Sequence, residues 1–539
     1  MIRNAIHSSA LPAHAAVPEH PYPQPTRNEE HPLSNAKSRP ALPGRPKLVS
    51  LLVGAALLGG CAIQPVATTQ AERQAELASQ RTTMFQNQEA ISGPISLDEA
   101  MARALKYNLD NRLKVMEEAL AQRQLDLSRW DMLPQLTAGA GYGWRNNDLA
   151  SVSKDVVTGQ QSLVPSVSSE RMHTTADLGM SWNVLDFGVS YYAAHQQADR
   201  VLVTRERRRK VVHLMMQQVR QAYWQAIGAQ LLDKKVEPIL KLTQKALDDS
   251  RKIEKEKLQS PLDTLNYQRQ LLDIIRQLEA VRDELAQAKP RLASIMNIPP
   301  GDEYTLATPA GFSTPKLPID PAAMEETALI NRPELVEASY NERIGLAETK
   351  KALAKMLPGI TVELGTNYDS DDFLVNNRWN TAGLRVSWNL LNVLNASNIQ
   401  GAAQAQYDVA KQQRLALNMA VLTQVHVAYR DYQGRKRQFE LSDDLNDVDQ
   451  RILTHTQNAA KSDAAGKLAE IRAQASAVMS ELRLYQAYGA LQNTYGQMLT
   501  TLGIDPLPEE VAGYDLPTLR AAIAEREKTL VEPASKKTR

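Results

Sequence analysis

The amino-acid sequence predicts an internally duplicated α+β membrane protein, and three observations lead to this fold class. A set of landmarks occurs twice along the chain, for example SWNVLDFG at 181–188 and SWNLLNVL at 387–394. Four segments alternate apolar and polar residues over about ten positions, a length that suits a tilted transmembrane β-strand. Two stretches of about 70 residues contain almost no helix-breaking residues, which predicts unusually long helices.

Composition excludes several classes of protein. The 539 residues include 62 basic and 61 acidic side chains, so a net charge of +1 gives no overall field that would attract nucleic acid. A single cysteine permits neither an intramolecular disulfide nor a multi-thiolate metal site. The histidines show no metal-ligand spacing and no nucleophile motif is present. We therefore expect no catalytic centre, no metal, no nucleic-acid partner and no cofactor beyond a covalent lipid.

Residues 1–60 are interpreted as a leader and lipoprotein signal peptide. Its apolar stretch, Leu48 to Gly60, has 13 residues, whereas a membrane-spanning helix needs about 20. The small residues before Cys61 resemble a bacterial lipobox, so Cys61 is expected to carry the lipid and 61–95 to form a lipidated N-terminal segment. An ordinary signal peptide with an incidental cysteine is the alternative. The long Pro-rich region at the start leaves open a translation start downstream of Met1.

The duplication covers nearly the whole chain after the signal peptide. Leu133 corresponds to Leu357, a spacing of 224 residues, and Trp182 corresponds to Trp388, a spacing of 206. The difference of 18 residues indicates one insertion in the first copy between these landmarks. The resulting division is a first repeat at 96–303, a Pro-rich linker at 304–321, a second repeat at 322–506, and a C-terminal segment and tail at 507–539.

Each repeat is predicted to contain one β-hairpin, at 133–184 and 357–391. In all four strands, Leu, Ala, Val or aromatic residues alternate with Gly, Ser, Thr or Asn. This pattern favours one face toward lipid and one toward water, with edge strands of a soluble sheet as the alternative. Aromatic residues near the strand ends are candidates for the girdles at the two membrane interfaces: Tyr142, Trp144, Trp182, Tyr368, Trp379 and Trp388.

The rest of each repeat is predicted to be helical. Short helices at about 96–131 and 322–356 precede the hairpins, and Ser96 begins the first of them in a capping-like sequence, Ser-Leu-Asp-Glu. Long helices at 189–258 and 395–465 follow, each about 105 Å long at about 1.5 Å per residue. Return helices are expected at 262–296 and 467–502. The basic run at 205–210 on the first long helix is expected to be a solvated face, with contact to anionic lipid headgroups as an alternative.

Four strands cannot close into a barrel within one chain. An open edge in lipid would leave backbone groups unpaired at several kcal/mol each, so the chain is expected to oligomerise. Two copies would give 8 strands and three would give 12, and periodicity alone does not choose between them.

These features together resemble the TolC-type outer-membrane efflux and secretion channels. The resemblance rests on the two-fold repeat, the lipobox, the SWN(V/L)L strand ends, the openings ALKYNLDN and ALINRPEL, and an Ala-Tyr pair on each long helix. It covers about residues 90–506. It implies a trimeric 12-stranded transmembrane β-barrel that continues into a periplasmic α-helical coiled-coil tunnel. In this arrangement 304–321 and the C-terminal segment form an equatorial belt.

The resemblance also implies site residues, partners and a location. A periplasmic gate would be lined by Asp263, with Glu470 and Arg472 near the matching position, which is Ala469 rather than an acidic residue. Turns at the tunnel tip would dock a periplasmic adaptor: Ser260, Pro261, Leu262, Ala465, Gly466 and Leu468. The further partner would be an inner-membrane pump or ABC exporter. The protein would be a lipid-anchored homotrimer in the outer membrane of a Gram-negative bacterium, extending into the periplasm.

The function implied is the channel component of a tripartite efflux or type I secretion system, a passive conduit rather than an enzyme. A different class of protein shares many of these features. A lipid-anchored periplasmic coiled-coil scaffold would have the long helices and Cys61, but it would have no use for four lipid-facing strands. The sequence does not select the cargo, which could be a drug, a protein, a polysaccharide or a siderophore.

Overall fold

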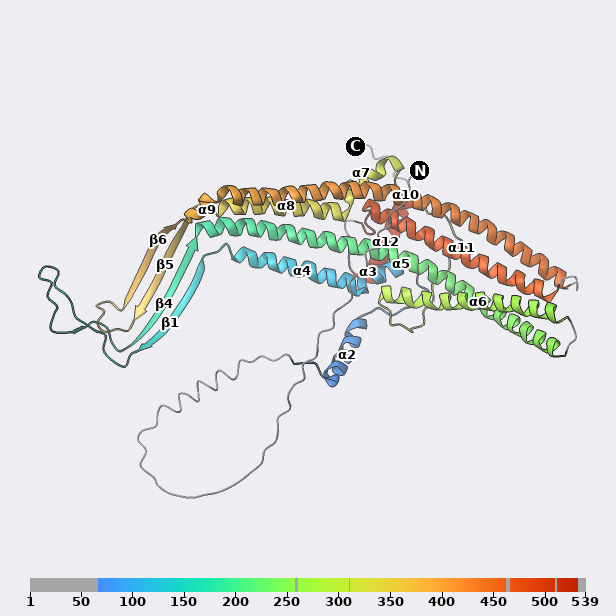
Figure 1. Cartoon of the computed structure of the whole chain (residues 1–539), viewed down its shortest axis with the longest axis horizontal. Helices are drawn as coiled ribbons and strands as arrows, with labels where there is room; N and C mark the ends of the chain where they lie inside the picture. Colours follow the sequence, from blue (N-terminus) through green and yellow to red (C-terminus); the bar gives the residue numbers. More distant parts are fainter. Residues whose placement is uncertain (1–65, 257–259, 310, 462–465, 509–510, 532–539) are drawn as a thin grey trace, which may run out of the picture. The chain divides into compact units, whose positions relative to one another are not determined.

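The computed structural model describes residues 66–256, 260–309, 311–461, 466–508 and 511–531 (Figure 1). The signal peptide predicted at 1–60 and the lipid-bearing Cys61 lie outside these residues. The chain divides into two units, Met1–Gln74 and Ala75–Arg539. Helix α2, Gln70–Phe85, was not expected from the sequence. The elements described below all belong to the second unit.

Four antiparallel strands form one sheet in the order β1-β4-β5-β6. Their bounds are Gln135–Trp144, Met172–Asn183, Gly359–Asp369 and Arg378–Ser387. Each repeat contributes one hairpin, and the pairing of β4 with β5 joins the two. The register is continuous, with Ala176 opposite both Ala140 and Tyr368. Because side chains alternate along each strand, the predicted apolar residues of all four strands lie on one face. A short ribbon of β2 (Ala150–Ser151) and β3 (Ser166–Val167) lies in the connection between β1 and β4.

Two very long helices follow the hairpins. Helix α5, Val184–Lys255, has 72 residues, and α10, Ala396–Lys461, has 66. Each is therefore about 100 Å long at about 1.5 Å per residue. Helix α5 begins five residues before the predicted position 189, directly after the last residue of β4. In the second repeat, the short helix α9, Leu390–Leu394, comes between β6 and α10.

The repeated Ser-Trp-Asn landmark marks the change from strand to helix. The side-chain oxygen of Asn183 accepts a hydrogen bond from the N–H of Leu185 at 2.9 Å, and Asn389 accepts one from Leu391 at 3.1 Å. Both asparagines are N-caps, which satisfy backbone donors that have no partner within the helix. The sequence repeats this landmark because both repeats need the same cap at the same junction.

The single helices predicted before each hairpin were wrong, because each is broken in two. Helices α3 (Leu97–Tyr107) and α4 (Leu109–Trp130) meet at Asn108, whose extended ψ of 129° ends the first and whose side chain caps the second. Helices α7 (Pro321–Asn331) and α8 (Pro333–Ala354) meet at Arg332. The residue before a proline is disfavoured in the α region, and Arg332 has ψ of 126°. The predicted cap at Ser96 is confirmed, since its hydroxyl accepts the N–H of Glu99.

The helices pack in an order that matches the order of the strands. On the half nearer the sheet, α4 packs on α5, α5 on α8, and α8 on α10 (Figure 1). On the other half, the return helices α6 (Pro261–Met296) and α11 (Lys467–Leu502) pack on α5 and on α5 with α10, respectively. Helix α11 ends at Gly503, which has φ of +69°, a left-handed conformation that glycine adopts at low cost.

The middle of the unit holds the main core and the segments predicted to form a belt. Leu306 from the 304–321 segment bridges Ile95, and the hydroxyl of Tyr223 on α5 donates to the carbonyl oxygens of Ile95 and Ala307. The 507–539 segment contains a helix that the sequence analysis missed, α12 at Leu516–Val531, which packs on α3. Large side chains buried in this core include Ile227, Leu232, Leu491 and Tyr495.

The basic run on α5 does not form a simple solvated face, which corrects the expectation for residues 205–210. Arg205 and Arg208 both pair with Glu118 on α4. On the opposite side, Arg207 and Lys210 pair with Glu337 and Glu334 on α8. Arg209 binds Asp505 after α11 at 2.8 Å. The run therefore ties α5 to its neighbours on both sides.

Candidate functional site: sheet edges, helix flanks and turn tips

The sheet has two free edges within the chain. Strands β1 and β6 are the outermost strands, and each is paired on one side only among the described residues. Unpaired backbone N–H and C=O groups along an edge require another strand when water is absent. The observed topology therefore leaves the sheet incomplete as a membrane wall until other strands pair with β1 and β6.

One face of the sheet is apolar and exposed. Leu136 on β1 is 69% exposed, and Leu384 and Val386 on β6 are 71% and 64% exposed. These residues lie on the same face by register. A continuous exposed apolar face on a soluble sheet would favour aggregation, whereas on a membrane wall it faces hydrocarbon.

Five of the six predicted interface aromatics lie on this apolar face. Tyr142, Trp144 and Tyr368 lie toward the hairpin loops, while Trp182 and Trp388 lie toward the long helices. All five are exposed, as are the two-banded aromatic girdles of membrane barrels. The indole N–H of Trp388 donates to the carbonyl oxygen of Met356 at 2.9 Å.

Trp379 departs from the prediction. It lies opposite Asn367 in the register of β5 and β6, and Asn367 belongs to the polar face. The sequence alternation already contained this signal, because Trp379 has the parity of Thr381 and Arg385. Trp379 is therefore a residue of the polar face rather than of the lipid-facing girdle.

The polar face carries paired charges and one carboxylate without a partner. Glu363 pairs with Arg385 at 3.2 Å, and Asp369 accepts a hydrogen bond from or donates one to His173 at 2.9 Å according to the histidine tautomer. Asp177 has no ion pair among the described residues. A Cβ built on Gly139 would lie 2.4 Å from the Asp177 carboxylate, so glycine leaves the space that this side chain occupies.

The outermost helices on the sheet side also lack partners within the chain. On α4, an exposed apolar stripe runs at helical spacing through Leu113, Met116, Leu120 and Leu127. On α10, a comparable set contains Met419, Val427, Leu441 and Leu445. Because α4 follows the β1 side and α10 the β6 side, the helix flanks and the sheet edges form two continuous open borders of the same protomer.

The two helix turns at the end away from the sheet lie together (Figure 1). Leu247, Leu271 and Ile471 form one buried cluster that joins the ends of α5, α6 and α11, and Leu468 packs against it. Of the predicted docking residues, the structure places Ser260, Pro261, Leu262, Gly466 and Leu468 here. Ala465 lies outside the described residues. Leu262 is 69% exposed, an apolar side chain presented at the tip.

The predicted gate residues are all in the first turns of the return helices. Asp263 on α6 is exposed, and Glu470 on α11 binds Lys467 at 2.8 Å. Arg472 is exposed and forms no ion pair with Asp263 within the described chain. The pairing of these two residues as a latch across subunits stays a prediction.

Sequence reasoning missed Tyr267, which lies one helical turn after Asp263. Burial raises the pKa of Tyr267, Lys467 opposes this increase, and Asp249 adds to it. The Tyr267 hydroxyl therefore lies among groups from α5 and α11, which shows that the two turns are close enough to interact. A single tyrosine in a helical sequence gives no signal of such a position.

Sequence reasoning also missed two buried ionic contacts in the middle of the unit. Burial alone would lower the pKa of Arg220 on α5, but the Glu527 carboxylate on α12 raises it. Burial alone would raise the pKa of Asp505, but hydrogen bonds from His213 and Arg209 lower it. These contacts fix the C-terminal segment against the long helix of the first repeat.

No helix in the described part of the chain is both long and apolar enough to cross a membrane. Within the same residues, no group of three or more histidine, cysteine, aspartate or glutamate side chains could hold a metal ion.

Comparisons with known proteins give one family match and several structural matches. Residues 100–297 match the family model described as outer membrane efflux protein. A comparison with curated proteins finds no significant sequence match. The three solved structures reported next share between 13% and 16% identity with the chain, so they establish the fold alone.

The solved structures are all outer-membrane proteins. The MtrE outer-membrane channel of Neisseria gonorrhoeae is 16% identical, with a TM-score of 0.57 over 78% of this chain and 94% of that one. The CmeC outer-membrane channel of Campylobacter jejuni is 13% identical, with a TM-score of 0.58 over 83% and 94%. The outer-membrane protein VceC of Vibrio cholerae is 14% identical, with a TM-score of 0.56 over 76% and 96%. The predicted fold of four strands and long helices in each chain is thereby confirmed.

Proposed function

This chain is a member of the outer membrane efflux protein family, and we propose that it is the outer-membrane channel of a tripartite efflux or type I secretion system. The observation that carries the proposal is the four-stranded sheet with two unpaired edges, an exposed apolar face and a polar face, continued by helices about 100 Å long. Such a protomer is one part of a wall with lipid outside and water inside. Transport through it is passive, and the protein catalyses no reaction.

The proposed channel is a homotrimer. Three copies supply 12 strands if β1 of one copy pairs with β6 of the next, and the same operation brings the apolar stripe on α4 against that on α10. A closed ring with one repeated contact satisfies both borders of every protomer. The choice of three copies rests on the family resemblance.

The proposed location is the outer membrane of a Gram-negative bacterium, with the helices in the periplasm and Cys61 lipidated. The lipobox-like sequence before Cys61 supports the anchor. Metabolic labelling with palmitate tests it, because labelling of the wild type and its loss in Cys61→Ala are expected. Equal labelling of both proteins would refute the assignment to Cys61.

The proposed partners are a periplasmic adaptor and an inner-membrane pump or ABC exporter. Exposed Leu262 and the clustered turns of α6 and α11 support a docking role for the tip. Cross-linking from a photoreactive amino acid at position 262 tests this role, and capture of a periplasmic adaptor is the expected result. The same photoreactive residue at exposed position 415 of α10 is the matched control.

Two measurements separate the channel from a lipid-anchored scaffold that never spans the membrane. The channel is expected to form trimers that resist SDS until heated and to conduct ions in planar bilayers. A monomeric, water-soluble protein without conductance would refute the proposal. Comparing drug susceptibility and secreted material after gene deletion would then identify the cargo class, which the proposal leaves open.

A further inference from the structure

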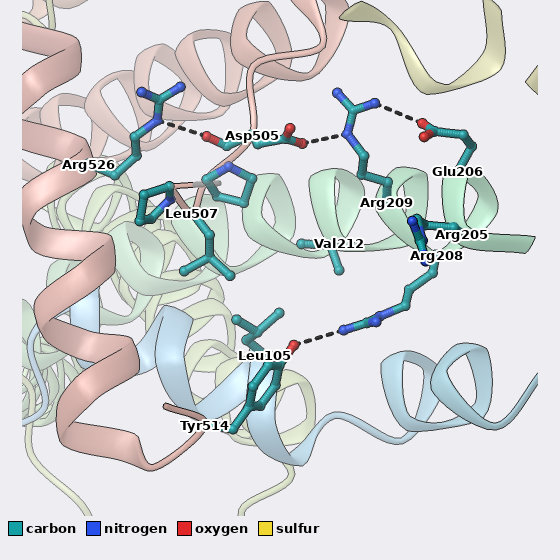
Figure 2. A pocket seen from close by; sticks show the side chains of 12 residues that line it. Leu105, Arg205, Glu206, Arg208, Arg209, Val212, Asp505, Leu507, Tyr514 and Arg526 are labelled. Carbon is teal, nitrogen blue, oxygen red and sulfur yellow. Dashed lines mark hydrogen bonds and ion pairs between the residues drawn. The ribbon is translucent and has the colours of Figure 1, made fainter. Parts of the chain in front are cut away.

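A cavity of about 760 Å³ opens beside α5 in the middle of the unit (Figure 2). Side chains from α3, α5, α12 and the segment after α11 line it. Cavities that bind small molecules typically measure about 300–1,000 Å³. This cavity is therefore large enough for a small ligand, and it is separate from the sheet, the flanks and the turn tips.

The floor of the cavity is apolar. Figure 2 shows Leu105, Val212 and Leu507 between two polar groups at its upper and lower borders. They come from three different segments of the chain, so the folded unit builds this floor rather than any one helix. An aliphatic group placed on it would be removed from water.

The border of the cavity is cationic. Four arginines line it, Arg205, Arg208, Arg209 and Arg526. The carboxylate of Glu118 is shared by Arg205 and Arg208. Arg209 pairs with Glu206 and Asp505. Four guanidinium groups thus face three carboxylates, which leaves an excess of positive charge.

Some arginine donors remain available to a ligand. Arg526 donates through Nε to the carbonyl oxygen of Asp505 at 3.1 Å, and its two terminal nitrogens bind no described residue. Arg205 uses Nε for Glu118 at 3.3 Å, and its side chain is 60% exposed. Arg208 is held by Glu118 and by the hydroxyl of Tyr514. Free guanidinium donors beside an apolar floor match an anionic head group on an aliphatic body.

We propose that this cavity is a binding site for a small organic anion whose carboxylate or phosphate meets Arg205 and Arg526 and whose aliphatic part covers Leu105, Val212 and Leu507. The ligand would join α12 and the segment after α11 to the long helix α5. This site is independent of the proposed conduit.

Hexanoate and hexyl phosphate are suitable probes, because they carry the two head groups on the same short chain. Binding is measured by isothermal titration calorimetry with the full-length protein in nanodiscs, and empty nanodiscs are subtracted. We expect saturable binding of at least one probe. The stronger of the two identifies the head group. Hexanamide, which has the same chain without charge, and inorganic phosphate, which has charge without a chain, are expected to bind at least tenfold more weakly.

Arg526→Gln and Arg205→Gln are expected to weaken binding of the preferred probe about tenfold each, because each removes a charge-assisted hydrogen bond. Arg430→Gln, which changes an exposed arginine on α10, is the matched control and is expected to bind as the wild type does. Arg205 is the more informative position because its exposed side chain contributes little to folding. An unchanged melting temperature confirms that the variant is folded.

Several results would overturn the assignment. Absence of saturable binding by both probes would refute the site, and equal affinity of Arg205→Gln and the wild type would refute its position. Equal binding of hexanamide would show that charge has no role, and equal binding of inorganic phosphate would show that the apolar floor has none. Because calorimetry requires no conductance, these results do not depend on whether the protein forms an open channel.

Discussion

Asn183 and Asn389 occupy the junction between strand and helix in the two repeats. Replacing Asn183 by alanine removes the hydrogen bond to the N–H of Leu185. Loss of an N-cap typically lowers the free energy of unfolding by about 0.5–2 kcal/mol. We therefore expect Asn183→Ala to lower the temperature at which the assembled protein dissociates in SDS. Asn183→Asp keeps an acceptor and should behave as the wild type, so equal losses in both variants would contradict the capping role.

Asp505 gives a pH dependence that can be assigned to one residue. Its carboxylate binds Nε2 of His213 at 2.6 Å and Nε of Arg209 at 2.8 Å. Burial opposes ionisation of Asp505, but these hydrogen bonds lower its pKa below the ordinary value. A carboxyl with a lowered folded pKa contributes stability above its unfolded pKa of about 3.9 and loses it as the pH falls through the folded value.

Asp505→Asn is therefore expected to melt at a lower temperature than the wild type at pH 7. The difference between the two proteins should shrink as the pH falls below about 4. Thermal melting followed by circular dichroism between pH 7 and pH 3 measures it. A difference that stays constant across this range would show that ionisation of Asp505 contributes nothing.

At the scale of elements, the sequence predicted most of the helices and strands because their patterns are long and regular. The period-two alternation located all four strands, and the absence of breakers located α5 and α10. The breaks at Asn108 and Arg332 were missed because each changes ψ at one residue without interrupting the helical composition. Helix α12 was missed because it is short and gains its stability from packing on α3.

The candidate site was predictable to a different extent. Strand parity fixed which residues share a face, and only Trp379 was assigned against its own parity. The contacts of the basic run could not be predicted, since Glu118, Glu334 and Glu337 lie about 90 to 130 residues away from it. The arginine cavity combines four separate segments, and no local pattern indicates such a combination.

Gly503 ends α11 where the chain passes the junction of α7 and α8. A Cβ at this position would lie 2.6 Å from the carbonyl oxygen of Asn331, and the φ of +69° already disfavours other residues. We expect Gly503→Ala to destabilise the protein by more than about 1 kcal/mol. Gly434→Ala on α10 is the control, because nothing lies within 4 Å of its added Cβ. Thermal melting that ranks the two variants equally would contradict this account.

At the scale of the whole molecule, the gate residue Asp263 acts only as part of a ring. In the proposed trimer, three exposed Asp263 carboxylates at the tip would favour cations over anions. Asp263→Asn is expected to reduce cation selectivity, measured as a smaller reversal potential across a KCl gradient in planar bilayers. Unchanged selectivity in a conducting Asp263→Asn channel would remove this residue from the gate while leaving the channel proposal intact.

The proposed seam between copies makes the last prediction. Leu120 on α4 is 59% exposed in the protomer, so a change there leaves the fold of a single chain intact. If α4 packs on α10 of the next copy, Leu120→Asp places a charge in a buried apolar contact, which is strongly unfavourable unless the charge is paired. Val156→Asp provides the matched control, because Val156 is 98% exposed in the connection between β1 and β4, away from the helix flanks.

We expect Leu120→Asp to reduce the fraction of SDS-resistant trimer severalfold, while Val156→Asp and Leu120→Met leave it unchanged. Gel electrophoresis without heating and native mass spectrometry measure this fraction independently. The flank and the sheet edge belong to the same border, so loss of the helix contact should also lower the yield of inserted, conducting protein. If Leu120→Asp assembles as well as Val156→Asp does, the α4 flank is not part of the seam, and closure of the wall must depend on the strand edges alone.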